Sequence, residues 1–149
     1  MISVLQRVSS ASVVVDGGTI ASIGPGLLVL TAVQVEDTDD DLRKTADKIL
    51  TLRAFPNGDK AYHLDITQLS PPGEILLVPN FTVAADISSG RRPSLHPAAP
   101  PLVAKEMFAQ LLCLLRSRHP PTQSGQFGAD MQVSLTNSGP LTLLYNTRL

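Results

Sequence analysis

Apolar and polar residues along the first quarter of the chain follow the patterns of β-strands. Ile2–Val8 and Ala11–Val15 alternate or run apolar and are rich in β-branched residues, which predicts two strands. Asp16–Gly18 predicts a tight hairpin turn into a third strand at Thr19–Ile23. The continuous apolar run Leu27–Val33 is typical of a buried strand. We therefore expect the chain to begin with a four-strand meander.

Two later segments have the hydrophobic period of an α-helix. The first is predicted at Asp39–Leu52, where Thr38 and Asp41 have the approximate spacing of a capping box. The second is predicted at Leu102–Ser117, because Pro100-Pro101 suits the first turn of a helix. Its expected apolar face consists of Val103, Met107, Leu111, Leu114 and Leu115.

The remaining predicted strands are short segments near the middle and the end of the chain. They are Glu74–Val78, Thr122–Phe127, Gln132–Thr136 and Leu141–Tyr145. Strands cluster at both ends and do not alternate with helices, so the pattern excludes a doubly wound nucleotide-binding fold. We expect a single α/β domain over residues 1–149, with a mixed, mainly antiparallel sheet curled into a barrel and two main helices outside it.

Two stretches fit no regular element. Pro79–Pro101 has no clear period, and loops of this length in a compact domain are usually functional or disordered.

In Asn137–Thr142, Pro140 cannot donate a ladder hydrogen bond and therefore requires a bulge, a sheet edge or a turn. Taken alone, these six residues favour an ordinary β-turn. Gly139-Pro140 is also a place where a cis peptide costs little.

Composition narrows the class of protein. The chain has 149 residues, of which 43% are hydrophobic and 17% charged, as expected for one globular domain. The net charge of −1 argues against broad, sequence-blind affinity for nucleic acid. Arg91-Arg92, Lys105, Arg116 and Arg118 nevertheless allow a local basic patch in the second half. The chain shows no leader pattern and no membrane-spanning run, so we expect it in the cytoplasm.

No side-chain pattern indicates a metal or a cofactor. His63, His96 and His119 are dispersed, and no glycine-rich phosphate loop occurs. The single cysteine, Cys113, excludes a disulfide framework and is expected in or near the core.

Candidate nucleophiles and bases are equally weak. Ser94 with His96, and His63 with Asp65, are better interpreted as solvated loop residues. Thr82 follows a buried strand, but no base is assured beside it, so a structural role is favoured for its hydroxyl. The backbone amides of Asn80, Phe81 and Thr82 could instead face an anion or a developing oxyanion. Arg91-Arg92 is at best a small phosphate site, and more often such a pair is a solvated loop tip.

Short motifs along essentially the whole chain resemble the D-aminoacyl-tRNA deacylase family. These motifs are Val4-Leu5-Gln6-Arg7-Val8, Ala11-Ser12-Val13, Asp16-Gly17, Ile23–Leu30, Lys48–Arg53, Gly90–Ser94, Ala98–Pro101, Phe127–Met131 and Asn137–Thr142. The resemblance implies hydrolysis of the ester between a D-amino acid and the terminal ribose of tRNA, a proofreading activity in translation. It implies mischarged glycyl-tRNA as a related substrate, and neither metal nor cofactor.

The resemblance also implies a homodimer in which each subunit's Gly139-Pro140 enters the other's active site. The two carbonyls there would capture the substrate's α-amino group and leave no room for an L side chain. Arg7 would hold this segment, and the amides of Asn80–Thr82 would bind the ester carbonyl region, with the 2′-hydroxyl of the tRNA assisting the attack. The expected substrate-binding set is Gly139, Pro140, Arg7, Phe127, Ala129, Met131, Asn137 and Thr142.

One signature departs from the family. Its usual Ser-Gln-Phe-Thr-Leu is here Pro79-Asn80-Phe81-Thr82-Val83, which removes a backbone donor and shortens an amide side chain. Two alternatives therefore stay open beside the D-specific enzyme: a non-catalytic tRNA-binding module, and a deacylase of shifted specificity.

Overall fold

The structure is a computed structural model that describes all residues, 1–149. Its central element is β1 (Ile2–Val15), a single strand where the sequence predicted two. β8 (Gln132–Asn146) follows one edge of β1 along nearly its whole length. The other edge is shared by β2 (Gly18–Ile23), which pairs with the second half of β1, and by β3 (Gly26–Ala32), which pairs with the first half. The predicted meander is therefore wrong, because β2 and β3 both pair with β1 and do not pair with each other.

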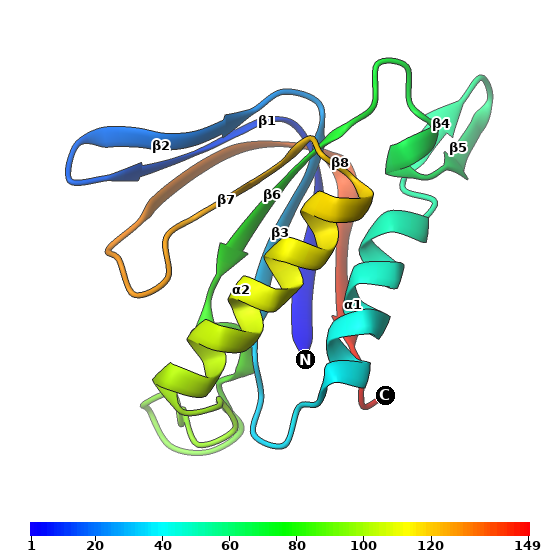
Figure 1. Cartoon of the computed structure of the whole chain (residues 1–149). Coiled ribbons are helices and arrows are strands. Elements are labelled where there is room, and N and C mark those ends of the chain that lie inside the picture. The colour runs from blue at the N-terminus through cyan, green and yellow to red at the C-terminus, as the bar shows by residue number, and fades with distance from the viewer.

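The sheet continues through two parallel pairings. β6 (Glu74–Pro79) pairs with β3, and β7 (Thr122–Ser124) pairs with β6, whereas all the pairings of β1 are antiparallel. Gln123 on β7 links the far edges of the sheet: its Nε2 donates to the Ser22 carbonyl of β2 at 2.6 Å, and the Ser22 N–H donates to its Oε1 at 3.0 Å. The sheet thus curls into a nearly closed barrel, as the sequence predicted (Figure 1).

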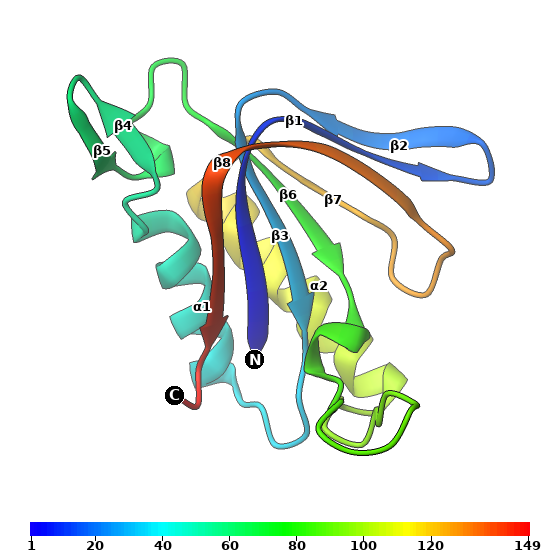
Figure 2. The ribbon, with the colours of Figure 1, turned by 180° about the vertical axis from the view of Figure 1, so that it is seen from behind.

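The two predicted helices are α1 (Asp39–Thr51) and α2 (Pro101–Arg118), and they lie on the same side of the sheet (Figures 1 and 2). Their buried residues, among them Ile49, Leu111 and Leu115, join the larger of two hydrophobic clusters. The shorter elements are β4 (Phe55–Asn57), β5 (Lys60–Leu64) and the 3₁₀ turns η1 (Ile66–Gln68) and η2 (Phe81–Ala84).

Two expectations about α2 are wrong. Val103 is 46% exposed, and Ala104 and Phe108 take its place on the buried face. Cys113 is exposed rather than near the core. It lies two positions from both Leu111 and Leu115, and residues two apart on a helix do not share a face.

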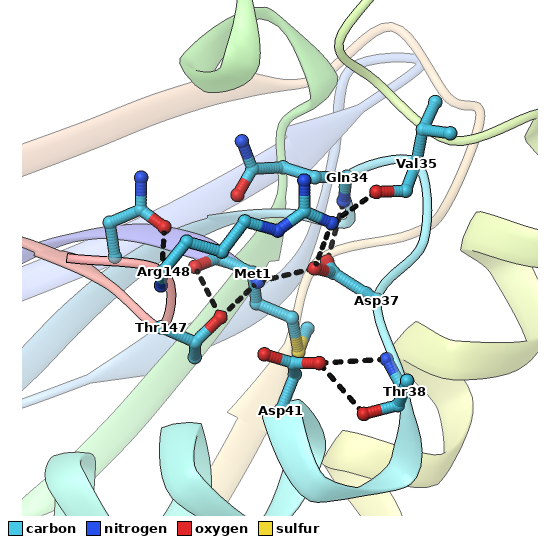
Figure 3. Close-up of polar contacts among 9 residues, drawn as sticks. Met1, Gln34, Val35, Asp37, Thr38, Asp41, Thr147 and Arg148 are labelled. Atoms are coloured by element: carbon cyan, nitrogen blue, oxygen red, sulfur yellow. Dashed lines mark hydrogen bonds and ion pairs between the residues drawn. The ribbon is translucent and has the colours of Figure 1, made fainter.

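A polar cluster joins both ends of the chain to the start of α1 (Figure 3). The buried Met1 ammonium group donates to Asp37 Oδ1 and to Thr147 Oγ1, each at 2.7 Å. Arg148 Nη2 approaches the same Asp37 oxygen at 3.0 Å. The Thr38 N–H and hydroxyl both donate to Asp41 Oδ2 at 2.8 Å, which confirms the predicted capping interaction.

Electrostatics within this cluster act on Asp41. Burial by itself would raise the pKa of the Asp41 carboxyl, but hydrogen bonds from Thr147 and Thr38 and the positive N-terminus lower it. The opposing effects leave that pKa far below its ordinary value. Asp41 is therefore charged in the folded protein throughout the neutral and mildly acidic range.

Candidate active site

A cavity of about 750 Å³ opens at the ends of β3 and β6, beside the first turn of α2. Twelve of its 19 lining residues are hydrophobic, so it suits a flat or apolar group better than a hydrated ion. The predicted site residues that line it are Asn80, Phe81, Phe127, Ala129 and Met131. Thr82 does not line the cavity.

Aromatic and sulfur contacts hold one wall of this cavity. The Phe127 ring packs against Phe108 of α2 with ring centroids 6.2 Å apart and planes tilted by 49°. The Gln126 N–H approaches the Met131 sulfur at 3.3 Å. Residues 127–131 are thereby positioned from two sides, by α2 and by their own loop.

Hydrogen bonds within the chain already use two of the three candidate backbone amides. The Asn80 N–H donates to the Thr31 carbonyl at 2.9 Å, and the Thr82 N–H donates to Asn80 Oδ1 at 3.1 Å. The Thr82 hydroxyl donates to the same oxygen at 2.6 Å. Phe81 begins η2, and the first N–H of a helix has no acceptor within the helix. Its amide is the one of the three that these contacts leave open.

The departure from the family signature lies in this wall. Pro79 ends β6 opposite Thr31 and lines the cavity. The side-chain oxygen of Asn80 accepts both hydrogen bonds from Thr82 and so stabilises the turn that contains Phe81. The Phe81 side chain is 56% exposed despite its size, and it lies at the cavity.

A second group of predicted residues comes together elsewhere, around a bulge in β8. Gln6 pairs with Thr142 and Val8 with Asn137, so residues 138–141 of β8 all lie opposite Arg7. The ordinary turn that these residues suggest by themselves is therefore wrong: the chain continues in one strand on both sides of a four-residue bulge. The Gly139–Pro140 peptide is cis, and both residues are exposed.

Side chains around the bulge hold it to β1. Arg7 donates from Nε to the Ser138 carbonyl at 3.1 Å, from Nη2 to the Gly139 carbonyl at 3.4 Å and from Nη1 to the Ala54 carbonyl at 2.6 Å. Asn137 Nδ2 donates to the Arg7 carbonyl at 2.9 Å and to the Leu141 carbonyl at 3.1 Å.

The two groups do not meet within one chain. None of Arg7, Asn137, Gly139, Pro140 and Thr142 lines the cavity. One chain therefore presents the cavity on one surface and the exposed residues Gly139 and Pro140 on another.

Among the weaker side-chain candidates, Asp65 and Ser94 have structural partners. Asp65 accepts from the Thr67 N–H and hydroxyl at 2.9 and 2.6 Å, which caps η1. The main chain of Ser94 forms an isolated bridge with Asp86, and His96 lines the cavity.

No group of three or more His, Cys, Asp and Glu residues is placed to hold a metal ion. None of the helices has the length and apolar character needed to cross a membrane.

Sequence reasoning missed much of the cavity. Leu95, Pro100, Pro101 and Ala104 line it from the long segment and from the start of α2, and Val35 lines it from the chain after β3. The sequence did contain one signal for these residues. Pro100-Pro101 marks the beginning of α2, and this end of the helix lies at the cavity.

Comparisons with known proteins find similar sequences along almost the whole chain. A sequence model of the family described as D-Tyr-tRNA(Tyr) deacylase matches residues 4–146. The D-aminoacyl-tRNA deacylase of Janthinobacterium sp. (strain Marseille) is 47% identical over 142 residues, covering 95% of this chain and 94% of its own length. The D-aminoacyl-tRNA deacylase of Herpetosiphon aurantiacus is 46% identical over 147 residues, covering 99% and 95%.

Two solved structures share the fold. The c-Myc DNA Unwinding Element Binding Protein superposes with a TM-score of 0.93 at 36% identity, with 99% of each chain covered. A probable eukaryotic D-amino acid tRNA deacylase has a TM-score of 0.77 at 17% identity, with 97% of each chain covered, which supports the fold alone.

Proposed function

Because the chain belongs to the D-Tyr-tRNA(Tyr) deacylase family, we propose that it hydrolyses the ester bond joining a D-amino acid to the terminal ribose of tRNA. Water adds to the ester carbonyl, the bond to the ribose oxygen breaks, and free D-amino acid and tRNA leave. The observation that carries the proposal is the family match over residues 4–146, which spans both the cavity and the bulge. Translation uses aminoacyl-tRNA in the cytoplasm, which is the compartment we propose.

The cavity is the proposed binding site for the 3′ end of the tRNA. Its mainly apolar lining suits the terminal adenosine, with Phe127, Ala129 and Met131 on one wall. The Phe81 N–H, just after the end of β6, is the proposed donor to the ester carbonyl as negative charge develops there. The 2′-hydroxyl of the terminal ribose assists the attacking water, so the proposed reaction requires no side-chain nucleophile.

Gly139 and Pro140 are the proposed chirality filter. Their carbonyls accept hydrogen bonds from the substrate's α-amino group, and the rigid main chain occupies the space that an L side chain needs. A carbonyl oxygen has two lone pairs, so the Gly139 carbonyl can accept from Arg7 and from substrate together. Glycine has no side chain to reject, which makes mischarged glycyl-tRNA a further proposed substrate.

The filter and the cavity are proposed to meet in a homodimer, each Gly139-Pro140 acting in the partner's site. Their separation within one chain supports this arrangement. So does β8, whose outer edge has no neighbouring strand and whose exposed apolar side chains include Leu135, Leu143 and Leu144.

Pro79 and Asn80 favour two alternatives. With one backbone donor fewer at the end of β6, the chain could bind aminoacyl-tRNA without turnover, or hydrolyse a different set of misacylated tRNAs. A substrate panel separates these alternatives from the leading proposal.

The test uses purified protein with tRNA charged with the D and L forms of one amino acid, and with glycyl-tRNA. We expect the D ester and the glycyl ester to be cleaved and the L ester to persist at the rate of spontaneous hydrolysis. Equal cleavage of D and L esters would refute the filter. Tight binding without turnover would select the binding module, and preferential cleavage of L esters would select altered specificity.

A further inference from the structure

A positively charged segment borders the cavity and has no role in the proposed reaction centre. Residues 87–105 contain Arg91, Arg92 and Lys105, whereas none of the 13 Asp and Glu residues of the chain lies there. The chain as a whole has a net charge of −1, so the segment is locally positive on a slightly acidic protein. Arg91 and Arg92 are exposed, and neither forms an ion pair.

Main-chain hydrogen bonds define the loop that carries the two arginines. The Asp86 N–H donates to the Ser94 carbonyl and the Ser94 N–H to the Asp86 carbonyl, each at 2.9 Å. The Asp86 carboxylate accepts from the Ser88 N–H at 2.8 Å, and its hydrogen bonds with Ser88 lower the pKa of Asp86. No ion pair joins Asp86 to either arginine. The arginines thus project from a closed loop whose ends are tied together.

The same segment continues directly into the cavity wall. Leu95 and His96 follow the loop and line the cavity. The Val35 N–H donates to the Pro97 carbonyl at 3.0 Å, which fixes this part of the segment next to the chain after β3. In Figure 2 the segment lies beside the end of β6 and the beginning of α2, the two elements that frame the cavity. The loop that carries Arg91 and Arg92 therefore lies next to the cavity wall, within reach of a polynucleotide whose 3′ end occupies the cavity.

We propose that Arg91 and Arg92 bind the phosphate groups of the RNA strand that extends from the cavity, and so hold the acceptor end of the tRNA. The inference rests on the proposed function for the identity of the RNA. Unpaired arginines suit phosphate because the guanidinium presents several N–H donors and stays charged. Two such contacts add salt-dependent affinity for tRNA without affecting chemistry at the ester.

The test compares two substrates that differ in their phosphates. One is D-aminoacyl-tRNA, and the other is the same D-amino acid esterified to adenosine, which has no phosphate. We expect Arg91→Gln with Arg92→Gln to lower kcat/KM for the tRNA substrate and to leave the adenosine ester unaffected. Each lost contact weakens binding roughly threefold at 0.2 M salt and roughly eightfold at 0.05 M, and reduces the salt slope by about 0.7.

A matched control is Arg43→Gln, which removes an exposed charge on α1. This variant should behave as wild type with both substrates. An unchanged salt slope in the Arg91 and Arg92 variant would overturn the inference, as would an equal loss with both substrates or an equal loss in the control.

Failure of the proposed function has a different signature. If the wild-type protein cleaves neither substrate, the deacylase proposal fails and the arginines are tested by binding alone. Wild type and variant are then compared for affinity to uncharged tRNA over a range of salt. The inference stands only if the variant's slope is shallower than that of wild type and of Arg43→Gln.

Discussion

At the scale of single residues, Arg7 is the side chain that joins the bulge of β8 to the rest of the fold. Its guanidinium reaches three carbonyls, those of Ser138, Gly139 and Ala54, from three different nitrogens. A lysine has the same charge but presents a single ammonium group and cannot reproduce this fork.

Arg7→Lys should therefore reduce activity through the position of the bulge. Hydrogen bonds to a charged group contribute about 1.5–3 kcal/mol each, so losing one predicts a decrease of roughly tenfold or more in kcat/KM for D-aminoacyl-tRNA. Discrimination against the L ester should weaken as well. Steady-state kinetics on both esters check this, with Arg43→Lys as the control, and an Arg7 variant of wild-type rate and selectivity would contradict it.

Asp41 makes stability depend on pH. Its pKa is lower in the folded protein than in the unfolded chain, so its contribution is complete above the unfolded value of about 4 and is lost as the pH falls below that. Asp41→Asn should cost about 0.5–2 kcal/mol of unfolding free energy at pH 7, as a lost helix cap does. The penalty should shrink between pH 4 and pH 3. Urea unfolding of both proteins across this range measures it, and a constant penalty would count against the assignment.

Single residues were predictable from the sequence where local chemistry decides their role. The capping pair Thr38 and Asp41 is an example, because its partners are three residues apart. Which amide of Asn80–Thr82 stays open was not predictable. That outcome depends on the Thr31 carbonyl, which lies nearly 50 positions away along the chain and meets Asn80 only through the pairing of β3 with β6.

At the scale of elements, β3 and β6 approach each other so closely that their pairing needs a glycine. A Cβ atom added to Gly26 would lie 1.8 Å from the Glu74 carbonyl oxygen. Backbone cannot move aside as a flexible side chain can, so Gly26→Ala must separate the strands that frame the cavity.

We expect Gly26→Ala to lower the unfolding free energy by about 3 kcal/mol or more. Gly18→Ala in the neighbouring hairpin is the matched control, because its Cβ would meet only the Val15 carbonyl oxygen at 3.7 Å. That variant should stay within about 1 kcal/mol of wild type. Urea unfolding of the two variants decides the point, and similar stabilities would show that β3 and β6 can separate freely.

Elements were predicted well where one period persists and less well where a strand contains an irregularity. α1 and α2 were located within a residue or two, since their apolar spacing is regular. β1 and β8 were each predicted as two strands, because Ser9-Ser10 and Ser138–Pro140 interrupt the apolar pattern. Both long strands continue through these interruptions because each provides the other with a ladder on both sides.

At the scale of the whole molecule, the proposed site is divided between two separate surfaces of the chain. Gly139 is exposed, and a Cβ added to it would meet nothing within 4 Å in its own chain. Gly139→Val should therefore fold normally and abolish activity by filling the partner's cavity. Ala129→Trp should abolish activity by blocking the cavity of its own chain.

Mixing the two inactive variants tests the proposed dimer. In a mixed dimer one site combines an open cavity with an unmodified Gly139-Pro140, so random exchange should restore roughly one quarter of the wild-type activity. The assay is D-aminoacyl-tRNA cleavage after subunit exchange, with each variant alone as the control. Absence of any recovery, despite mixed dimers detected by mass spectrometry, would show that the site is not shared.

The barrel with outer helices was predictable from strand and helix content, but the contact that joins the far edges of its sheet was not. Closure involves Gln123 and Ser22, about 100 positions apart, and nothing in either local sequence marks them as partners. The division of the candidate site between two surfaces was implied only by resemblance to the family. Within one chain the periodicity describes how that chain folds and carries no information about a second copy.

The four-residue bulge in β8 also affects how the family can change over evolution. In an ordinary strand, inserting or deleting one residue moves every later side chain to the opposite face of the sheet. Here the ladder with β1 resumes on both sides of residues 138–141, at Asn137 and at Thr142. A change in the length of the bulge is absorbed before it reaches the register of either half. Selection can therefore remodel the segment proposed to choose the substrate while the barrel that supports it stays the same.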